Sequence, residues 1–254
     1  MASPRGFLAA PLLVAAIFVG CGGSEGRAQT SGGDTASDGR VSTPTSKGGG
    51  ACAPGEYALR LGNGRVARLR ITPGPSKKPK GLIVAFHGAG GSASEGLFIF
   101  RGAWNVPGLV LVAPAALGNT WSALHQKEDR DLETVNRALA QAWRRCRIDR
   151  RRVAVGGFSD GATHALSIGL QNGDVFRSVL ALSPGGLADV ERRGKPRVFI
   201  THGTRDDVLP IDRSDTAVRT LRSSGYTVTY RRFGGGHRVT EEISRTAVRW
   251  YLRR

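Results

Sequence analysis

Acidic residues, cysteines and long apolar runs are all scarce in this chain of 254 residues. Its three cysteines and five histidines form no cluster with the spacing of metal ligands, which argues against a zinc centre and predicts no metal or other cofactor. No segment reaches the roughly 20 consecutive apolar residues that a stable transmembrane helix needs. No internal repeat is present, so the sequence also argues against solenoid and fibrous architectures.

The scarcity of acidic residues leaves a strongly positive charge balance. Lys and Arg number 37 against 20 Asp and Glu, which gives a formal net charge of +17. Such a surface attracts anions such as nucleic acid, anionic lipid or an acidic envelope polymer. Basic runs such as residues 150–152 are not accompanied by a nucleic-acid motif or interleaved aromatic residues, so nucleic acid is not an expected partner. We favour a solvated, arginine-rich face.

The first 21 residues have the layout of a secretory signal peptide. Arg5 precedes the apolar stretch 7–19, which ends just before Cys21. Residues 18–21, Phe-Val-Gly-Cys, resemble a bacterial lipobox, in which the cysteine is lipidated and becomes the mature N-terminus, although Phe18 stands where leucine is usual. We therefore expect an exported protein that contacts a membrane only through a lipid on Cys21. Ordinary cleavage and release to the periplasm or the medium is the alternative.

Residues 22–51 are expected to form a disordered linker. Gly, Ser, Thr and other polar residues fill this stretch, and Val41 is its one large apolar side chain. A flexible tether of this length would span roughly 30 Å, which is enough to hold a folded domain off a membrane surface. The folded domain is predicted over residues 52–254, a length that suits one ordinary domain.

Cys52 and Cys146 are the two cysteines that remain after Cys21. In an oxidising compartment an even number of cysteines favours a disulfide, which here would tie the start of the domain to the segment before a central strand. Sequence spacing carries no geometry, so the pairing of these two residues is a hypothesis.

From residue 52 onward the hydrophobic pattern alternates between strands and helices. Residues 57–61 and 66–71 alternate apolar with polar side chains around Gly-Asn-Gly, which predicts a hairpin at a sheet edge. Continuous apolar runs predict strands that are buried on both faces, at 82–86, 109–112, 153–155, 179–182 and 198–200. Helical patterns cover 132–143, 162–170, 216–221 and 243–251. The alternation predicts an α/β fold, with a mostly parallel sheet flanked by helices and a site at the carboxyl ends of the strands.

Ser159 is the candidate nucleophile. It lies at the centre of a Gly-x-Ser-x-Gly sequence, between Gly157 and Gly161, directly after the strand at 153–155 and before a helix. This is the spacing of the nucleophile elbow, a tight strand-to-helix turn that presents the hydroxyl at the helix N-terminus. The spacing alone arises often by chance in a chain with 36 glycines, so the flanking strand and helix are what favour a catalytic role.

A serine hydroxyl is a poor nucleophile at neutral pH, so it needs a base and a group that orients the base. Asp206 and Asp207 follow the strand at 198–200, and His237 follows three glycines after the strand at 228–233. The three loops would meet at one sheet edge, in the chain order Ser, Asp, His that α/β-hydrolases use. The other histidines have weaker claims: His87 and His202 begin His-Gly turns, His125 lies in a loop and His164 lies in the helix after Ser159.

Over about residues 56–252 the chain resembles the α/β-hydrolase superfamily, in particular small serine esterases of the phospholipase/carboxylesterase and polyhydroxybutyrate-depolymerase-like groups. The matching pieces are His-Gly-Ala-Gly-Gly at 87–91, the elbow, His-Gly-Thr-x-Asp-x-x-Leu-Pro at 202–210 and the Gly-Gly-His that ends at His237. The resemblance selects Asp206 over Asp207, because the family's acid stands four residues after the His of the His-Gly-Thr segment. The stretch at 183–197 is short where lidded lipases carry insertions, which predicts an α/β-hydrolase fold with no large lid.

The resemblance also implies an oxyanion hole and a pocket residue. Acyl transfer needs donors aimed at the developing oxyanion, each worth about 3 kcal/mol, and the N–H groups of Asp160 and Ala89 are the expected pair. The loop at 114–121 resembles the family's loop that ends in a tryptophan beside the pocket, so Trp121 would contact the acyl or alcohol group. Packing of Trp121 against the core is the alternative.

These residues together predict an exported serine esterase. His237 would take the proton of Ser159, Asp206 would orient the imidazole, and water would hydrolyse the acyl-enzyme. The open site would admit small or polymeric esters. A serine peptidase or thioesterase on the same fold is one alternative, because a triad does not by itself choose its substrate. A lipoprotein that uses this fold only to bind an anionic envelope component is the other, and the sequence predicts no oligomeric state.

Overall fold

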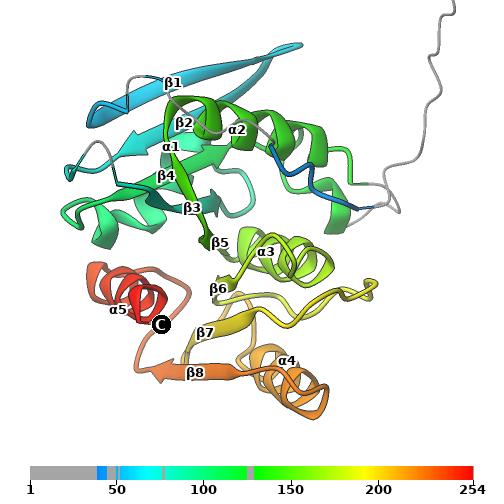
Figure 1. Cartoon of the computed structure of the whole chain (residues 1–254). Coiled ribbons are helices and arrows are strands. Elements are labelled where there is room, and N and C mark those ends of the chain that lie inside the picture. The colour runs from blue at the N-terminus through cyan, green and yellow to red at the C-terminus, as the bar shows by residue number, and fades with distance from the viewer. Residues whose placement is uncertain (1–38, 45–49, 51, 76–77, 125–128, 254) are drawn as a thin grey trace, which may run out of the picture. The chain divides into compact units, whose positions relative to one another are not determined.

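The computed structural model describes residues 39–44, 50, 52–75, 78–124 and 129–253 of the chain. Within them, one eight-stranded sheet carries helices on both faces (Figure 1). The expected signal peptide at 1–21, its Cys21 and the loop histidine His125 lie outside the described residues. No helix in the described ranges is long and apolar enough to cross a membrane.

The sheet is mostly parallel, as the apolar runs predict. Its strands are β1 (Gly55–Gly62), β2 (Arg65–Ile71), β3 (Lys80–Phe86), β4 (Leu109–Pro114), β5 (Ile148–Phe158), β6 (Ser178–Leu182), β7 (Arg197–Gly203) and β8 (Val228–Phe233). They lie in the order β1-β2-β4-β3-β5-β6-β7-β8, and only the pairs β1–β2 and β2–β4 are antiparallel. Because β5 to β8 are parallel neighbours, the segments that follow them emerge at one edge of the sheet. The predicted α/β fold class is confirmed.

The predicted hairpin at the sheet edge is confirmed and joins β1 to β2. Its turn residues Gly62, Asn63 and Gly64 have φ angles of 82°, 52° and 72°. Positive φ costs glycine nothing and asparagine little, so this Gly-Asn-Gly sequence fits the twist that a tight hairpin turn requires.

Five α-helices flank the sheet, and one of them was not expected from the hydrophobic pattern. They are α1 (Ala93–Ile99), α2 (Leu132–Arg145), α3 (Asp160–Gln171), α4 (Asp212–Ser223) and α5 (Glu241–Leu252), within the described residues. The short α1 has seven residues, too few for a clear helical period. Its signal is local instead, because Ser92 accepts a hydrogen bond from the N–H of Glu95 and so forms the start of a capping box.

Each central strand contributes to two separate apolar cores. In β3, Val84 and Phe86 pack with residues of α2 and α3 on one face of the sheet. Ile83 and Ala85 point the other way and pack with residues of α1 and α5. Burial on both faces explains why these strands appear in the sequence as unbroken apolar runs.

Residues 39–44 lie against the domain, where the sequence predicts part of a disordered linker. Val41 is 5% exposed and belongs to the α2–α3 core, and its N–H donates to Asn172 Oδ1 over 2.8 Å. Arg40 forms an ion pair with Asp174, and the N–H of Ser42 donates to Asn136 Oδ1. The expectation of disorder is therefore wrong for residues 40–42, because the one large apolar side chain of the stretch is buried and its backbone is hydrogen-bonded. Residues 22–38, 45–49 and 51 of the expected linker lie outside the described residues.

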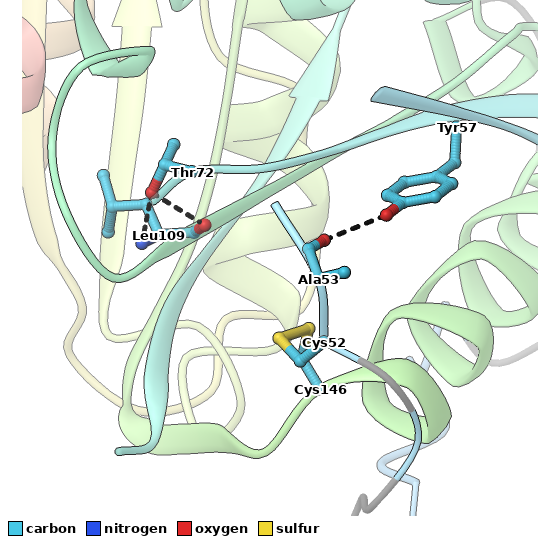
Figure 2. Close-up of a disulfide and its surroundings, with 6 residues drawn as sticks. All are labelled: Cys52, Ala53, Tyr57, Thr72, Leu109 and Cys146. Carbon is cyan, nitrogen blue, oxygen red and sulfur yellow. Dashed lines mark hydrogen bonds between the residues drawn. A yellow bond between two sulfur atoms is a disulfide. The ribbon is translucent and has the colours of Figure 1, made fainter. Parts of the chain in front are cut away.

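A disulfide joins the chain before β1 to the end of α2. Cys52 and Cys146, the pair expected from the sequence, have their Sγ atoms 2.00 Å apart (Figure 2). The hydroxyl of Tyr57 donates to the Ala53 carbonyl over 3.0 Å, next to this bond (Figure 2). The Arg145 guanidinium lies 3.7 Å from the centre of the Tyr57 ring. The entry to the sheet is thus attached to α2 by a covalent bond and by a cation–π contact.

Candidate active site

Ser159 lies at the turn between β5 and α3, at the edge where the parallel strands end. Its φ and ψ angles are 57° and −125°, a conformation that is strained for any residue except glycine. The flanking glycines are required by close approach of the backbone. A Cβ atom at Gly157 would lie 2.4 Å from the Gly161 carbonyl oxygen, and one at Gly161 would lie 2.3 Å from the His87 carbonyl oxygen. The Gly-x-Ser-x-Gly sequence therefore forms a tight strand-to-helix turn of the nucleophile-elbow type.

His237 comes to this turn from the loop after β8. The centre of its ring lies 4.6 Å from the centre of the Phe158 ring, and Phe158 directly precedes Ser159. Gly203, at the end of β7, makes room for this loop, because a Cβ atom there would lie 2.4 Å from the Gly235 carbonyl oxygen. The imidazole is therefore held beside the serine turn, although the two segments are nearly 80 residues apart in the chain.

Asp206 orients the His237 ring. Its Oδ2 atom is 2.7 Å from His237 Nδ1, and its side chain is fully buried. A carboxylate only accepts hydrogen bonds, so Nδ1 carries a proton and Nε2 of the neutral ring is free to act as an acceptor. By contrast, Asp207 is exposed and forms no hydrogen bond to a described residue. Of these two neighbouring carboxylates, Asp206 is the one that contacts His237.

Hydrogen bonds keep the Asp206 carboxylate charged. Burial on its own raises the pKa of this carboxyl, but the N–H groups of Leu209 and Val208 donate to Oδ1 over 2.9 and 3.1 Å. Together with the bond from His237 and the attraction between the two groups, they lower the pKa of Asp206 below its ordinary value. An ionised, fixed carboxylate is what the orienting role requires.

His202 also contacts the Asp206 carboxylate. It is fully buried, and its Nε2 atom lies 2.8 Å from the Leu209 carbonyl oxygen and 3.2 Å from Asp206 Oδ2. Both are acceptors, so Nε2 carries the proton and Nδ1 accepts from the Ser214 hydroxyl over 2.7 Å. His202 thus shapes the turn that holds Asp206, as its place in a His-Gly turn suggests. Sequence reasoning missed Ser214, which no local motif marks.

The loop after β3 presents backbone donors next to Ser159. A Cβ atom at Gly88 would lie 3.3 Å from Ser159 Cβ, so this loop touches the serine. Gly90 has a φ of 70°, and its N–H donates to the Asn119 carbonyl over 2.6 Å. Among the described residues, neither the N–H of Ala89 nor that of Asp160 donates to any acceptor. Both expected oxyanion donors are therefore unengaged in this structure.

Three hydrogen bonds fix the position of this loop. His87 Nδ1 donates to the Gly88 carbonyl over 2.7 Å, and its Nε2 accepts from the Ala116 N–H over 3.0 Å. The indole N–H of Trp121 donates to the His87 carbonyl over 2.9 Å. The His87 ring is therefore neutral, with its proton on Nδ1, and it joins the loop after β3 to the loop after β4.

Trp121 packs in the core. Its side chain is fully buried, and its ring stacks on that of His164 with centres 4.8 Å apart and an angle of 6°. The centre of the Phe86 ring lies 4.7 Å from the centre of the Trp121 ring. Of the two roles that the sequence allows Trp121, the structure supports packing. Its assignment to the substrate pocket is not supported, because no part of the side chain reaches the surface.

The loop before Trp121 is held by carboxylates that sequence reasoning missed. Thr120 Oγ1 donates to Asp160 Oδ2 over 2.6 Å, which attaches this loop to the residue after the candidate nucleophile. Asp131 is fully buried and accepts from the N–H groups of Leu117 and Ser122 over 2.7 and 2.8 Å. An aspartate directly before a helix is typical of an N-cap, but the Asp131 side chain makes no capping bond to α2 and holds the loop instead.

The segment between β6 and β7 is short, and its residues 183–196 contain no helix that could form a lid. The structure has cavities of about 650 and 580 Å³, and neither is lined by Ser159 or His237. Within the described ranges, no three His, Cys, Asp or Glu side chains are arranged to hold a metal ion.

The chain is similar in sequence to known esterases and hydrolases. Residues 120–249 match the sequence model of a family described as phospholipase/carboxylesterase. NocK of Nocardia uniformis subsp. tsuyamanensis, named as an esterase, is 29% identical over 172 residues, which are 61% of this chain and 49% of NocK. This chain thus spans about half the length of that relative. MhqD of Bacillus subtilis strain 168, named as a hydrolase, is 26% identical over 184 residues, which are 67% of this chain and 92% of MhqD.

Solved structures show the same fold. The structure of esterase PE8 has a TM-score of 0.59 and 25% identity, and the match covers 70% of this chain and 94% of that chain. FphF, a fluorophosphonate-binding serine hydrolase of Staphylococcus aureus, has a TM-score of 0.62. Its identity is 15%, over 80% of this chain and 100% of that chain, so this likeness concerns the fold alone.

Proposed function

Because this chain belongs to the phospholipase/carboxylesterase family and has the α/β-hydrolase fold, we propose that it is a serine esterase with Ser159, His237 and Asp206 as its catalytic triad. The observation that carries the proposal is the 2.7 Å hydrogen bond between Asp206 and His237, made by a ring that lies against Phe158. It orients a neutral imidazole next to the strained serine turn, where an acyl-transfer enzyme needs its base.

Acylation begins when Ser159 Oγ attacks the ester carbonyl carbon. His237 Nε2 takes the hydroxyl proton, and the carbonyl oxygen becomes an oxyanion that accepts hydrogen bonds from the N–H groups of Ala89 and Asp160. When the tetrahedral intermediate collapses, His237 gives this proton to the departing alcohol oxygen. The product is an acyl-enzyme ester on Ser159.

Deacylation repeats these steps with water. His237 takes a proton from the water, whose oxygen attacks the acyl carbon, and the proton returns to Ser159 Oγ as the carboxylic acid leaves. Asp206 stays ionised throughout and stabilises the charged imidazole. The hydrogen bonds that Asp206 accepts from the N–H groups of Val208 and Leu209 favour its ionised form.

The open site favours esters that a closed pocket would exclude. The segment between β6 and β7 contains no helix that could cover Ser159, and the Trp121 indole is buried in the core, so this indole does not narrow the entrance. The substrate class that fits is a carboxylic ester with a bulky alcohol or acyl part, small or polymeric. The same triad can also hydrolyse thioesters and amides, so both are included as substrates in the test.

The test is hydrolysis of p-nitrophenyl esters of increasing acyl length, alongside hydroxyalkanoate esters, a matched thioester and aminoacyl anilides. We expect ester hydrolysis to exceed anilide hydrolysis and to disappear in Ser159→Ala. Faster turnover of the thioester or the anilide would assign the chain to the alternative activity. If the folded protein hydrolyses neither the esters, the thioester nor the anilides, the result would favour a binding module.

We also propose that the protein is exported and lipidated at Cys21. The disulfide between Cys52 and Cys146 supports export, because such bonds persist in oxidising compartments. In a bacterial host, the full chain should fractionate with membranes, and Cys21→Ser should shift the protein out of the membrane fraction. Equal membrane association of the two proteins, or retention of both in the cytosol, would contradict the proposal.

A further inference from the structure

The larger of the two cavities is lined by residues of α5, β7 and β8, and Ser159 is not among them. Its volume is about 650 Å³, and it is lined by both strands, the loop after β8 and α5. Sites for small organic ligands usually measure roughly 300–1,000 Å³. Gly234 and Arg238, which flank the turn that carries His237, are among the lining residues. The cavity is therefore large enough for a small organic ligand, and it borders the loop that carries His237.

The charge around this cavity is strongly positive and is not neutralised by the protein. Its lining contains one acidic residue, Glu242, and four arginines: Arg231, Arg238, Arg249 and Arg253. None of these four guanidinium groups makes a hydrogen bond or ion pair with a described residue. The neighbouring Arg232, which is not part of the lining, pairs with Asp215 over 2.8 Å. The arginines of the cavity are thus available to an anion, whereas their neighbour is not.

The floor of the cavity is apolar and contains one buried polar atom without a partner. Phe199 and Trp250 form part of the floor, with ring centres 5.3 Å apart. Thr229 uses its hydroxyl to accept from the Trp250 indole N–H over 2.9 Å. Thr201 is 3% exposed, and its Oγ1 atom has no hydrogen-bond partner among the described residues. An unsatisfied buried hydroxyl costs about 1–3 kcal/mol, so Thr201 is a donor and acceptor in need of a partner.

We propose that this cavity binds an organic carboxylate with an aromatic or aliphatic body, at a site separate from Ser159. The carboxylate accepts hydrogen bonds from the arginines, which bind planar anions with two parallel donors, and the apolar body packs on Phe199 and Trp250. Thr201 supplies a hydrogen bond from the floor. A bare inorganic anion would use the arginines but leave the aromatic floor without contacts, so an amphipathic anion fits the lining better.

The experiment is calorimetric titration of the full mature chain with 2-naphthoate. We expect one site, and at least tenfold weaker binding in Arg231→Ala and in Arg249→Ala. Thr201→Val should weaken binding severalfold while the melting temperature stays the same or rises, because the hydroxyl that it removes has no partner in the free protein. Arg60 is an exposed residue of β1, at the far edge of the sheet, so Arg60→Ala removes the same charge and should leave the affinity unchanged.

Two further comparisons fix the nature and the place of the site. The neutral 2-naphthamide should bind at least tenfold more weakly than 2-naphthoate. Ser159→Ala should bind 2-naphthoate as tightly as the original chain, whether or not the protein proves to be an esterase. No binding of 2-naphthoate, equal binding of the amide, equal weakening by Arg60→Ala, or weaker binding in Ser159→Ala would each overturn the proposal.

Discussion

Two histidines of this chain, His237 and His164, occupy opposite chemical environments a short way from the same serine. His237 is partly accessible and is hydrogen-bonded through Nδ1 to an ionised carboxylate. His164 lies in α3, is fully buried and stacks on Trp121, and neither of its ring nitrogens has a hydrogen-bond partner in the described part of the chain. The first ring is arranged to exchange a proton, and the second is packed as an aromatic side chain.

The contrast shows how surroundings decide what an imidazole does. Burial lowers the pKa of His164, and this effect outweighs the opposing attraction of Asp129 and Asp131. At neutral pH, therefore, His164 is uncharged and contributes packing to the cluster with Phe86 and Trp121. His237 has an acceptor nitrogen left over after its bond to Asp206 and can take a proton from a neighbour.

Replacing each of the two histidines separately should give the largest difference in kcat/KM. His237→Gln should lower kcat/KM for a p-nitrophenyl ester by about 10⁴ to 10⁶-fold, because the base is lost. His164→Leu should keep kcat/KM within a few-fold, since this ring only packs. Steady-state kinetics of both folded variants measures the difference. Comparable losses of kcat/KM in the two variants would contradict the different roles assigned to His237 and His164.

The next largest effect on activity is expected at Asp206, whose carboxylate is hydrogen-bonded to His237. Asp206→Asn should lower kcat by about 10⁴-fold, because an amide can hold the ring in the wrong tautomer and cannot stabilise its charged form. The neighbouring Asp207 provides a matched control, since it is exposed and has no partner among the described residues. Asp207→Asn should retain full activity, and a similar loss there would mean that the acid has been misassigned.

The cluster around His164 should contribute to stability, whereas His237 is the base of the proposed triad. Trp121→Ala should lower the free energy of unfolding by about 3–5 kcal/mol, because it removes a fully buried indole and its bond to the His87 carbonyl. Urea unfolding at pH 7.5 measures this loss. A change below about 1 kcal/mol would indicate that Trp121 is not packed as described.

The smallest effect is a pH dependence of stability due to His164. Its pKa is lowered in the folded chain and returns to about 6.5 on unfolding, so the unfolded chain binds the proton first as the pH falls. Stability should therefore fall below about pH 6.5, by at most about 1.4 kcal/mol per pH unit from this group. His164→Leu should show a smaller slope between pH 7.5 and 5. An unchanged slope would contradict the burial argument.

Sequence motifs mark the backbone turns of the candidate site, whereas the side chains that support these turns carry no local signal. The glycines around Ser159 and before His237 are demanded by local backbone approach, so a local motif reveals them. Trp121 could not be placed, because a motif that ends in tryptophan does not say which way the indole points. The roles of Asp131 and Ser214 depend on contacts with distant loops, and the burial of Val41 depends on a surface of α3 and α2 that no local pattern encodes.

The most direct measurement is to label the full chain with a fluorophosphonate, digest it and locate the adduct by tandem mass spectrometry. The account predicts one adduct, on Ser159, with the labelling rate unchanged in Asp207→Asn and strongly reduced in His237→Gln. An adduct on another residue, or labelling of Ser159 at the same rate without His237, would contradict the claim that this imidazole activates this serine.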